Sequence, residues 1–216
     1  MMQVLIGLMA SVFVVFCVMP IHEYAHALIA TKLGDPTPER TGRLTLSPLA
    51  HIDVMGALMI LLVGFGYAKP VRVSARNFKN PKAGMALTAV AGPIANILMA
   101  FLFILLSNCA AVAYINFGDL VWKVSTSFFS FAASINISLA VFNFLPIPPL
   151  DGSKILSLII PSKYYFKYLQ YERYIILAVF ALIVFGILDT PLRIASDFVY
   201  GLLSKLAYLP FKAMGY

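Results

Sequence analysis

Residues 4–33 read VLIGLMASVFVVFCVMPIHEYAHALIATKL and are almost entirely apolar. A helix that spans a bilayer needs about 20 consecutive apolar residues, so this stretch is long enough to cross. Three ionisable side chains, His22, Glu23 and His26, follow Pro20 within it. Because such groups are costly in hydrocarbon, they indicate a functional site at membrane depth.

The composition of the whole chain assigns it to the integral membrane proteins. Of its 216 residues, 61% are hydrophobic and 12% are charged, against roughly 45–50% and about 25% in soluble domains. The mean hydropathy is +0.90. A soluble domain of this size cannot bury that much apolar surface. We therefore exclude soluble enzymes, nucleic-acid-binding modules, disulfide scaffolds and disordered proteins.

The apolar pattern predicts an all-α integral membrane protein with about four transmembrane helices. Besides the first stretch, the expected spans are residues 84–106, 128–145 and 174–188. Residues 54–68 are apolar but short for a span, so we expect a re-entrant or interfacial segment there. Residues 40–46 alternate between polar and apolar side chains, which predicts a small β element near the cytoplasmic face. We expect one membrane-embedded domain over residues 1–216, with a core at about residues 4–155 and C-terminal helices over 156–216.

Two basic loops predict the orientation of the chain in the membrane. Lysine and arginine residues are concentrated in residues 69–82 and 154–173, and the positive-inside rule places both loops in the cytoplasm. The two spans between them then form a hairpin whose connecting loop, residues 107–127, lies outside. We expect a multi-pass protein of the plasma membrane.

Residues 22–26, His-Glu-Tyr-Ala-His, fit the pattern H-E-x-x-H. Positions i and i+4 share one face of a helix, so His22 and His26 can bind one zinc ion. Glu23 lies on an adjacent face, where it can take a proton from a metal-bound water. Each of these groups costs roughly 2.5–3.5 kcal/mol at the centre of a membrane helix, which argues against a chance occurrence.

A catalytic zinc ion normally has three protein ligands and one open position, so a third ligand is needed. Asp151 is a good candidate because it follows a span broken by Pro146, Pro148 and Pro149. Proline ends a regular helix, and unwound backbone at membrane depth persists only where it lines a cavity or is covered by protein. His51 is either a residue that supports this site or, as we favour, a loop histidine bonded to backbone.

These motifs resemble those of the site-2 proteases, zinc metalloproteases that cut within membranes. Residues 22–26 match the first motif of that family, and residues 143–152, NFLPIPPLDG, match the second. Residues 91–96, AGPIAN, look like a further family element. The resemblance covers about residues 15–155, and the chain is similar to the short prokaryotic form.

The resemblance implies a role for each site residue. His22, His26 and Asp151 would be the ligands of one zinc ion per chain, and Glu23 would be the catalytic acid and base. Asn143 would support the substrate or the oxyanion. Since Asp151 lies near the cytoplasmic end of its span, we expect the active site towards the cytoplasmic side.

The leading hypothesis is a zinc-dependent intramembrane endopeptidase that acts in regulated intramembrane proteolysis. Its partners would be single-span membrane-protein substrates, cut in or near their transmembrane segments, and the lipid bilayer, with no nucleic acid. The alternative is a metal-ion transporter or a non-proteolytic metal-binding membrane scaffold, which also explains ionisable groups at membrane depth. Neither alternative requires a base beside His22, and a transporter often shows two related halves, which this sequence lacks.

Overall fold

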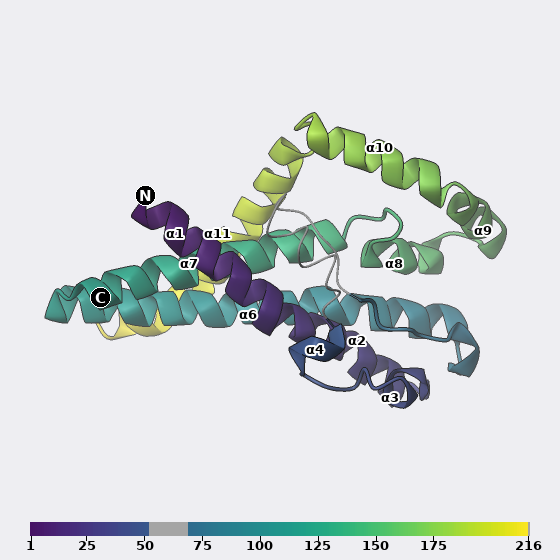
Figure 1. Ribbon diagram of the computed structural model, residues 1–216, viewed down its shortest axis with the longest axis horizontal. Helices are drawn as coiled ribbons and strands as arrows, with labels where there is room; N and C mark the ends of the chain where they lie inside the picture. The colour runs from purple at the N-terminus through teal and green to yellow at the C-terminus, as the bar shows by residue number, and fades with distance from the viewer. Residues whose placement is uncertain (52–68, 216) are drawn as a thin grey trace.

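A computed structural model of the chain describes residues 1–51 and 69–215. In these two ranges every regular element is a helix, and the long helices lie side by side with shorter ones gathered at one end (Figure 1). The prediction of an all-α protein is therefore confirmed. The predicted re-entrant or interfacial segment, residues 54–68, lies outside the described residues.

The first membrane helix is continuous but changes its winding. Helix α1 (Met2–Phe13), a π-helical turn (Val14–Val18) and α2 (Met19–Lys32) together form a 31-residue apolar helix long enough to cross a membrane. Pro20 stands in the first turn of α2 and has no N–H to donate. The wider turn before it accommodates that missing hydrogen bond. The predicted first span is thus present.

Helices α6 (Pro81–Phe117) and α7 (Leu120–Asn143) form the predicted hairpin and can each cross a membrane. The predicted loop at residues 107–127 is wrong, because only a turn at Gly118 and Asp119 separates the helices. Gly118 has a φ of +72°, and its N–H donates to the Tyr114 carbonyl at 2.8 Å. Polar side chains after the turn bond to their own helix, as Thr126 Oγ1 does to the Trp122 carbonyl at 2.9 Å. The polar side chains of this part of α7 therefore do not interrupt the helix.

The C-terminal part contains α8 (Asp151–Ile159), α9 (Ser162–Gln170), α10 (Glu172–Val184) and α11 (Asp189–Ala213). The apolar helix predicted at residues 174–188 is present in part as α10, which ends at Val184. The 13 residues of α10 extend only about 20 Å, and α11 is bent from α10 by 83°. Gly186, with a φ of +68°, ends α10 by donating its N–H to the Ile183 carbonyl. The described residues thus hold three helices that can cross, or four if the bent pair makes one span.

The predicted β element at residues 40–46 is also wrong. Arg40 is instead the last residue of the short helix α3 (Thr37–Arg40), and residues 41–43 form a turn that caps its C-terminal end. Gly42 donates its N–H to the Glu39 carbonyl, and Arg43 donates its own to the Pro38 carbonyl. A polar–apolar alternation becomes a strand only with a partner strand, and no strand occurs in the described ranges.

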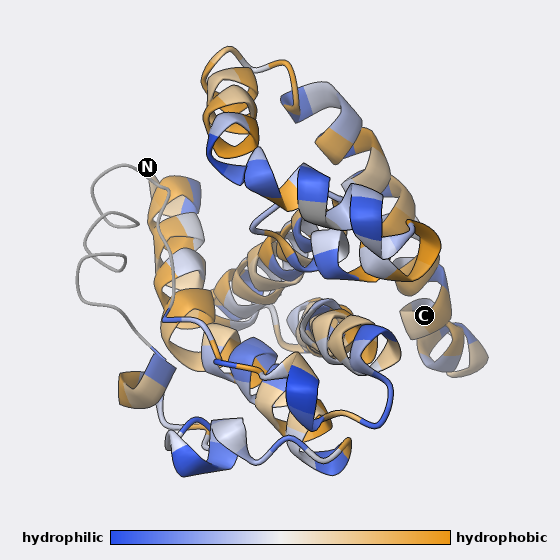
Figure 2. Cartoon of the chain, turned by 90° about the vertical axis from the view of Figure 1, so that its right-hand side faces the viewer, coloured by the Kyte–Doolittle hydropathy of each residue, from blue (hydrophilic) through white to orange (hydrophobic). Residues whose placement is uncertain are grey.

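A core of small and aromatic side chains holds the long helices together. Its alanines allow close approach between helices, and they are buried on α1, α6, α7 and α11: Ala10, Ala100, Ala132, Ala133 and Ala207. Hydrophilic residues gather instead on the short helices and connections at one end of the bundle (Figure 2).

Candidate metal centre

The two histidines of the H-E-x-x-H segment lie one turn apart on α2 and point to the same place. Their Nε2 atoms are 3.0 Å apart, and both side chains are buried. The Nδ1 atom of His26 lies 2.7 Å from the Thr88 carbonyl of α6. Because a carbonyl only accepts, His26 must donate from Nδ1, which leaves its Nε2 lone pair free for a metal.

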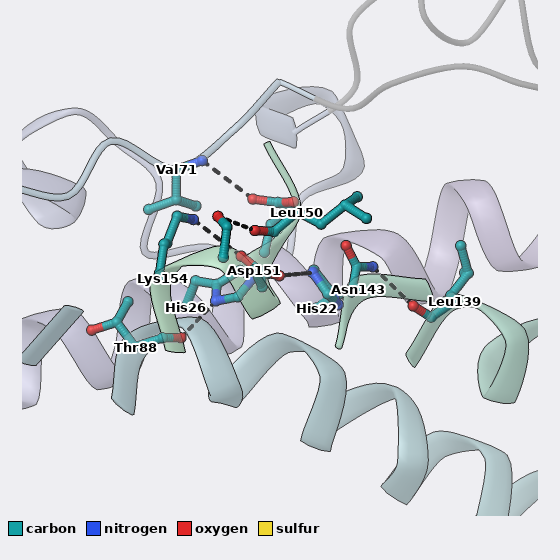
Figure 3. A network of polar contacts seen from close by, with 11 residues as sticks. His22, His26, Val71, Thr88, Leu139, Asn143, Leu150, Asp151 and Lys154 are labelled. Atoms are coloured by element: carbon teal, nitrogen blue, oxygen red, sulfur yellow. Dashed lines mark hydrogen bonds and ion pairs between the residues drawn. The ribbon is translucent and has the colours of Figure 1, made fainter. Parts of the chain in front are cut away.

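Asp151 reaches the same place from the first residue of α8. Its Oδ2 atom is 3.4 Å from His22 Nε2 and 3.1 Å from His26 Nε2 (Figure 3). The chain turns sharply between the end of α7 and α8, and Gly152 permits this turn. A Cβ atom at Gly152 would collide with the carbonyl oxygens of Phe144 and Leu145. The glycine after Asp151 therefore lets α8 begin directly against the end of α7.

The three donor atoms fit a tetrahedral zinc ion. Ligand atoms about 2.0–2.1 Å from such an ion stand about 3.3–3.4 Å apart, and the three separations here are 3.0, 3.1 and 3.4 Å. Two imidazoles and one carboxylate are also a donor set that zinc accepts. All three side chains are buried, so the set has the shape and chemistry of a metal site.

Helix α6 forms one wall of this centre at Gly92. A Cβ atom there would contact His26 Nε2 and would stand 2.6 Å from His22 Nε2. The absence of a side chain therefore allows the two imidazoles to occupy their positions. Residue spacing along the chain could not predict this contact. The one signal in the sequence was that Gly92 lies in residues 91–96, the segment that looks like a further family element.

The extended segment 69–74 contacts the Glu23 side chain of α2. The Oε2 atom of Glu23 accepts the N–H of Val71 at 3.2 Å. The segment is anchored at both ends, because Lys69 donates its N–H to the His51 carbonyl at 2.8 Å and Ser74 donates to Asp35 Oδ2 at 2.7 Å. Sequence reasoning missed this contact, since backbone donors carry no residue signature.

Asp35 is the fully buried anchor of that segment. Besides Ser74, it accepts hydrogen bonds from Asn77 Nδ2 at 2.6 Å and from the hydroxyl and N–H of Thr37 at 2.6 and 3.1 Å. Burial opposes ionisation of this carboxyl, but these hydrogen bonds outweigh it and hold the pKa of Asp35 below its usual range.

The other two predicted residues donate their side-chain hydrogen bonds to backbone carbonyls. His51 is buried and donates from Nε2 to the Thr45 carbonyl at 2.7 Å, so it bonds to backbone as predicted, although it ends the short helix α4 (Pro48–His51) and does not lie in a loop. Asn143 is the last residue of α7 and donates from Nδ2 to the Leu139 carbonyl at 3.0 Å. Among the described residues its side chain makes this bond within its own helix and none with the metal-site residues.

One family profile and several relatives match this chain. The sequence profile of peptidase family M50 matches residues 107–186, which include Asp151. The chain is 41% identical over 157 residues to YwhC of Bacillus subtilis, covering 71% of this chain and 70% of that protein. No solved structure gives a significant match.

Two more distant relatives match over a smaller part of their length. The chain is 31% identical over 137 residues to Rip2 of Mycolicibacterium smegmatis, which covers 61% of this chain and 50% of that protein. It is 30% identical over 136 residues to MJ0611 of Methanocaldococcus jannaschii, 62% of each chain. All three relatives carry names that describe zinc metalloproteases. This chain therefore belongs to peptidase family M50, the site-2 protease family of zinc-dependent metalloproteases.

Proposed function

We propose that this metalloprotease is an intramembrane endopeptidase with His22, His26 and Asp151 as zinc ligands and Glu23 as its acid and base. One observation carries the proposal. Three ligand atoms converge within 3.4 Å of one another, and two of them belong to a helix long and apolar enough to cross a membrane. A metal site on such a helix can act on peptide bonds at membrane depth.

His22, His26 and Asp151 would hold the zinc ion, which would act as a Lewis acid that activates water and polarises the scissile carbonyl. Glu23 accepts the proton of the attacking water and donates it to the leaving amine. Its position beside His22 on α2 keeps the carboxylate next to the ligands. The Val71 N–H restrains that carboxylate. Asn143 would support the substrate or the oxyanion by turning its amide from the Leu139 carbonyl into the site.

We propose single-span membrane proteins as substrates, cut in or near their transmembrane segments during regulated intramembrane proteolysis. The site faces the cytoplasmic side of the plasma membrane in this proposal. Two features support that orientation: the basic segment 69–82 reaches Glu23 through Val71, and the basic segment 154–173 continues directly from Asp151. The positive-inside rule favours the cytoplasm for both segments.

We also propose that residues 1–216 act as one membrane-embedded domain. Helix α11 contributes Leu203 and Ala207 to the same buried core as α1, α6 and α7. The Asn108 side chain of α6 also donates to the Ala207 carbonyl at 3.4 Å. These contacts argue that the C-terminal helices belong to the catalytic unit.

The test compares the wild-type protein with Glu23→Gln in liposomes, using a panel of single-span peptides and counting zinc in both proteins. We expect cleavage by the wild type alone at equal zinc content, because glutamine keeps the size of Glu23 but cannot accept the proton. Cleavage by Glu23→Gln at the wild-type rate would refute the role of Glu23. If both proteins contain zinc, neither cleaves any peptide and zinc crosses the liposome membrane, the result would favour a metal-ion transporter instead.

A further inference from the structure

The two oxygens of the Asp151 carboxylate have different partners. Oδ2 faces the two imidazoles, at 3.4 Å from His22 and 3.1 Å from His26. Oδ1 instead accepts a hydrogen bond from Lys154 Nζ at 3.1 Å, as Figure 3 shows. Oδ2 therefore faces the metal site, and Oδ1 bonds to the lysine.

We propose that Lys154 is a positioning residue that makes Asp151 a metal ligand through one oxygen only. By occupying Oδ1, the ammonium group keeps the second oxygen away from the metal and leaves a coordination position open for water and the substrate carbonyl. This inference rests on the ligand set given under the proposed function. It adds a specific residue that determines how one of those ligands binds.

The chemistry of carboxylates explains why such control is needed. A carboxylate binds metal ions through one or both oxygens, and the choice depends on what else the second oxygen bonds to. A catalytic zinc site requires three protein ligand atoms and an open position. If Asp151 supplied both oxygens, a fourth protein atom would crowd or fill that position. A charge-assisted hydrogen bond to Oδ1 is strong enough to compete with this second contact.

The position of Lys154 on α8 suits this role. Residues i and i+3 are neighbours on a helix surface, so Lys154 lies beside Asp151, the first residue of α8. The Asp151 side chain is 9% exposed, whereas that of Lys154 is 40% exposed. The lysine thus approaches from the open side of the centre while the imidazoles occupy the buried side. An ordinary exposed ion pair contributes little to stability, so the significance of this pair lies in its contact with a ligand of the metal site.

Cobalt substitution tests the proposal without relying on proteolysis. Co²⁺ replaces zinc in such sites, and its visible absorption per bound ion is stronger for four-coordinate than for five-coordinate geometry. The variants are Lys154→Met, which keeps the length without the charge, and Lys154→Arg, which keeps the charge. Lys163→Met on α9 is the matched control, because Lys163 is exposed and belongs to a different helix.

We expect Lys154→Met to bind one Co²⁺ per chain with a weakened visible band, and Lys154→Arg and Lys163→Met to retain the wild-type band. In the zinc protein, kcat of Lys154→Met should fall by about 10- to 100-fold, the usual effect of losing a residue that orients a metal ligand. KM should change less, and Lys154→Arg should recover most of the kcat.

Three results would overturn the proposal. A wild-type band in Lys154→Met would show that Asp151 binds in the same way without the lysine. Loss of Co²⁺ from a Lys154→Met protein that keeps its wild-type helix content would show that the lysine acts on affinity instead. A wild type that binds no Co²⁺ would remove the ligand set itself, and with it this inference. If the wild type binds Co²⁺ but cleaves no peptide, the proteolytic proposal fails while the spectra still decide the role of Lys154.

Discussion

The contact between Gly92 and the two imidazoles leads to a quantitative prediction for Gly92→Ala. The new Cβ atom would stand 2.6 Å from His22 Nε2 and would also contact His26 Nε2, whereas ordinary Cβ contacts lie at 3.4–4 Å. The His22 ring would have to retreat by about 0.8 Å, the difference between these distances, which is several times the roughly 0.2 Å tolerance of a metal–ligand distance. His26 cannot retreat freely, because its Nδ1 atom is bonded to the Thr88 carbonyl on the same helix as Gly92.

The expected loss follows from the cost of this displacement. Overpacking a well-packed site costs about 1–3 kcal/mol, and each 1.4 kcal/mol is a factor of about ten in affinity. We therefore expect zinc to bind about 5- to 150-fold more weakly to Gly92→Ala. Displacement of reacting groups by about 1 Å costs roughly 100-fold in rate, so cleavage should remain about two orders of magnitude lower even when zinc is saturating.

The assay measures zinc affinity by competition with a chromogenic chelator and peptide cleavage at saturating zinc. The matched control is Gly201→Ala on α11, where an added Cβ atom would meet no other group within 4 Å. This control should keep wild-type zinc affinity and cleavage, with stability unchanged or slightly raised because alanine is the better helix former. Wild-type affinity and rate in Gly92→Ala would refute the reasoning, since the close contact would then impose no constraint on the ligands.

Three further predictions concern the anchor, the turn and the metal. Asp35→Asn should lower the free energy of unfolding by about 1–3 kcal/mol at pH 7, because an amide leaves buried donors unpaired. The folded-state pKa of Asp35 lies below its ordinary value of 3.8, so the carboxylate stabilises the fold above that pH. The difference between variant and wild type should therefore shrink as pH falls below 3.8, and an equal difference in thermal unfolding at pH 3 and pH 7 would contradict this. Gly152→Ala should lower zinc content and cleavage together, because its Cβ would collide with the Phe144 and Leu145 carbonyls and displace Asp151; a full zinc content by elemental analysis would count against that role. Removal of metal with a chelator should abolish cleavage, and one zinc ion per chain should restore it; activity that survives complete removal would exclude a zinc-dependent reaction.

Much of this protein could be predicted from its sequence because the deciding interactions are local or depend on composition. The apolar stretches predict membrane helices without reference to any other part of the chain, and three of them are present as helices that can cross. The i, i+4 spacing of His22 and His26 likewise depends only on the geometry of one helix. The prolines before Asp151 predicted the break that ends α7 at Asn143. These signals were sufficient for the fold class and for the residues of the candidate centre.

The tertiary structure decided what depends on contacts between distant segments. Residues 40–46 have the alternation of a strand, but they lack a partner strand in the described ranges, and residues 41–43 cap α3 instead. The helix predicted at residues 174–188 ends at Val184, and an 83° bend separates it from α11. The contact of Gly92 with the imidazoles and the hydrogen bond from Lys154 to Asp151 are likewise invisible in the sequence. The physical reason is that strand pairing, helix bending and side-chain contact are settled by which surfaces meet, and residue spacing along the chain does not contain that information.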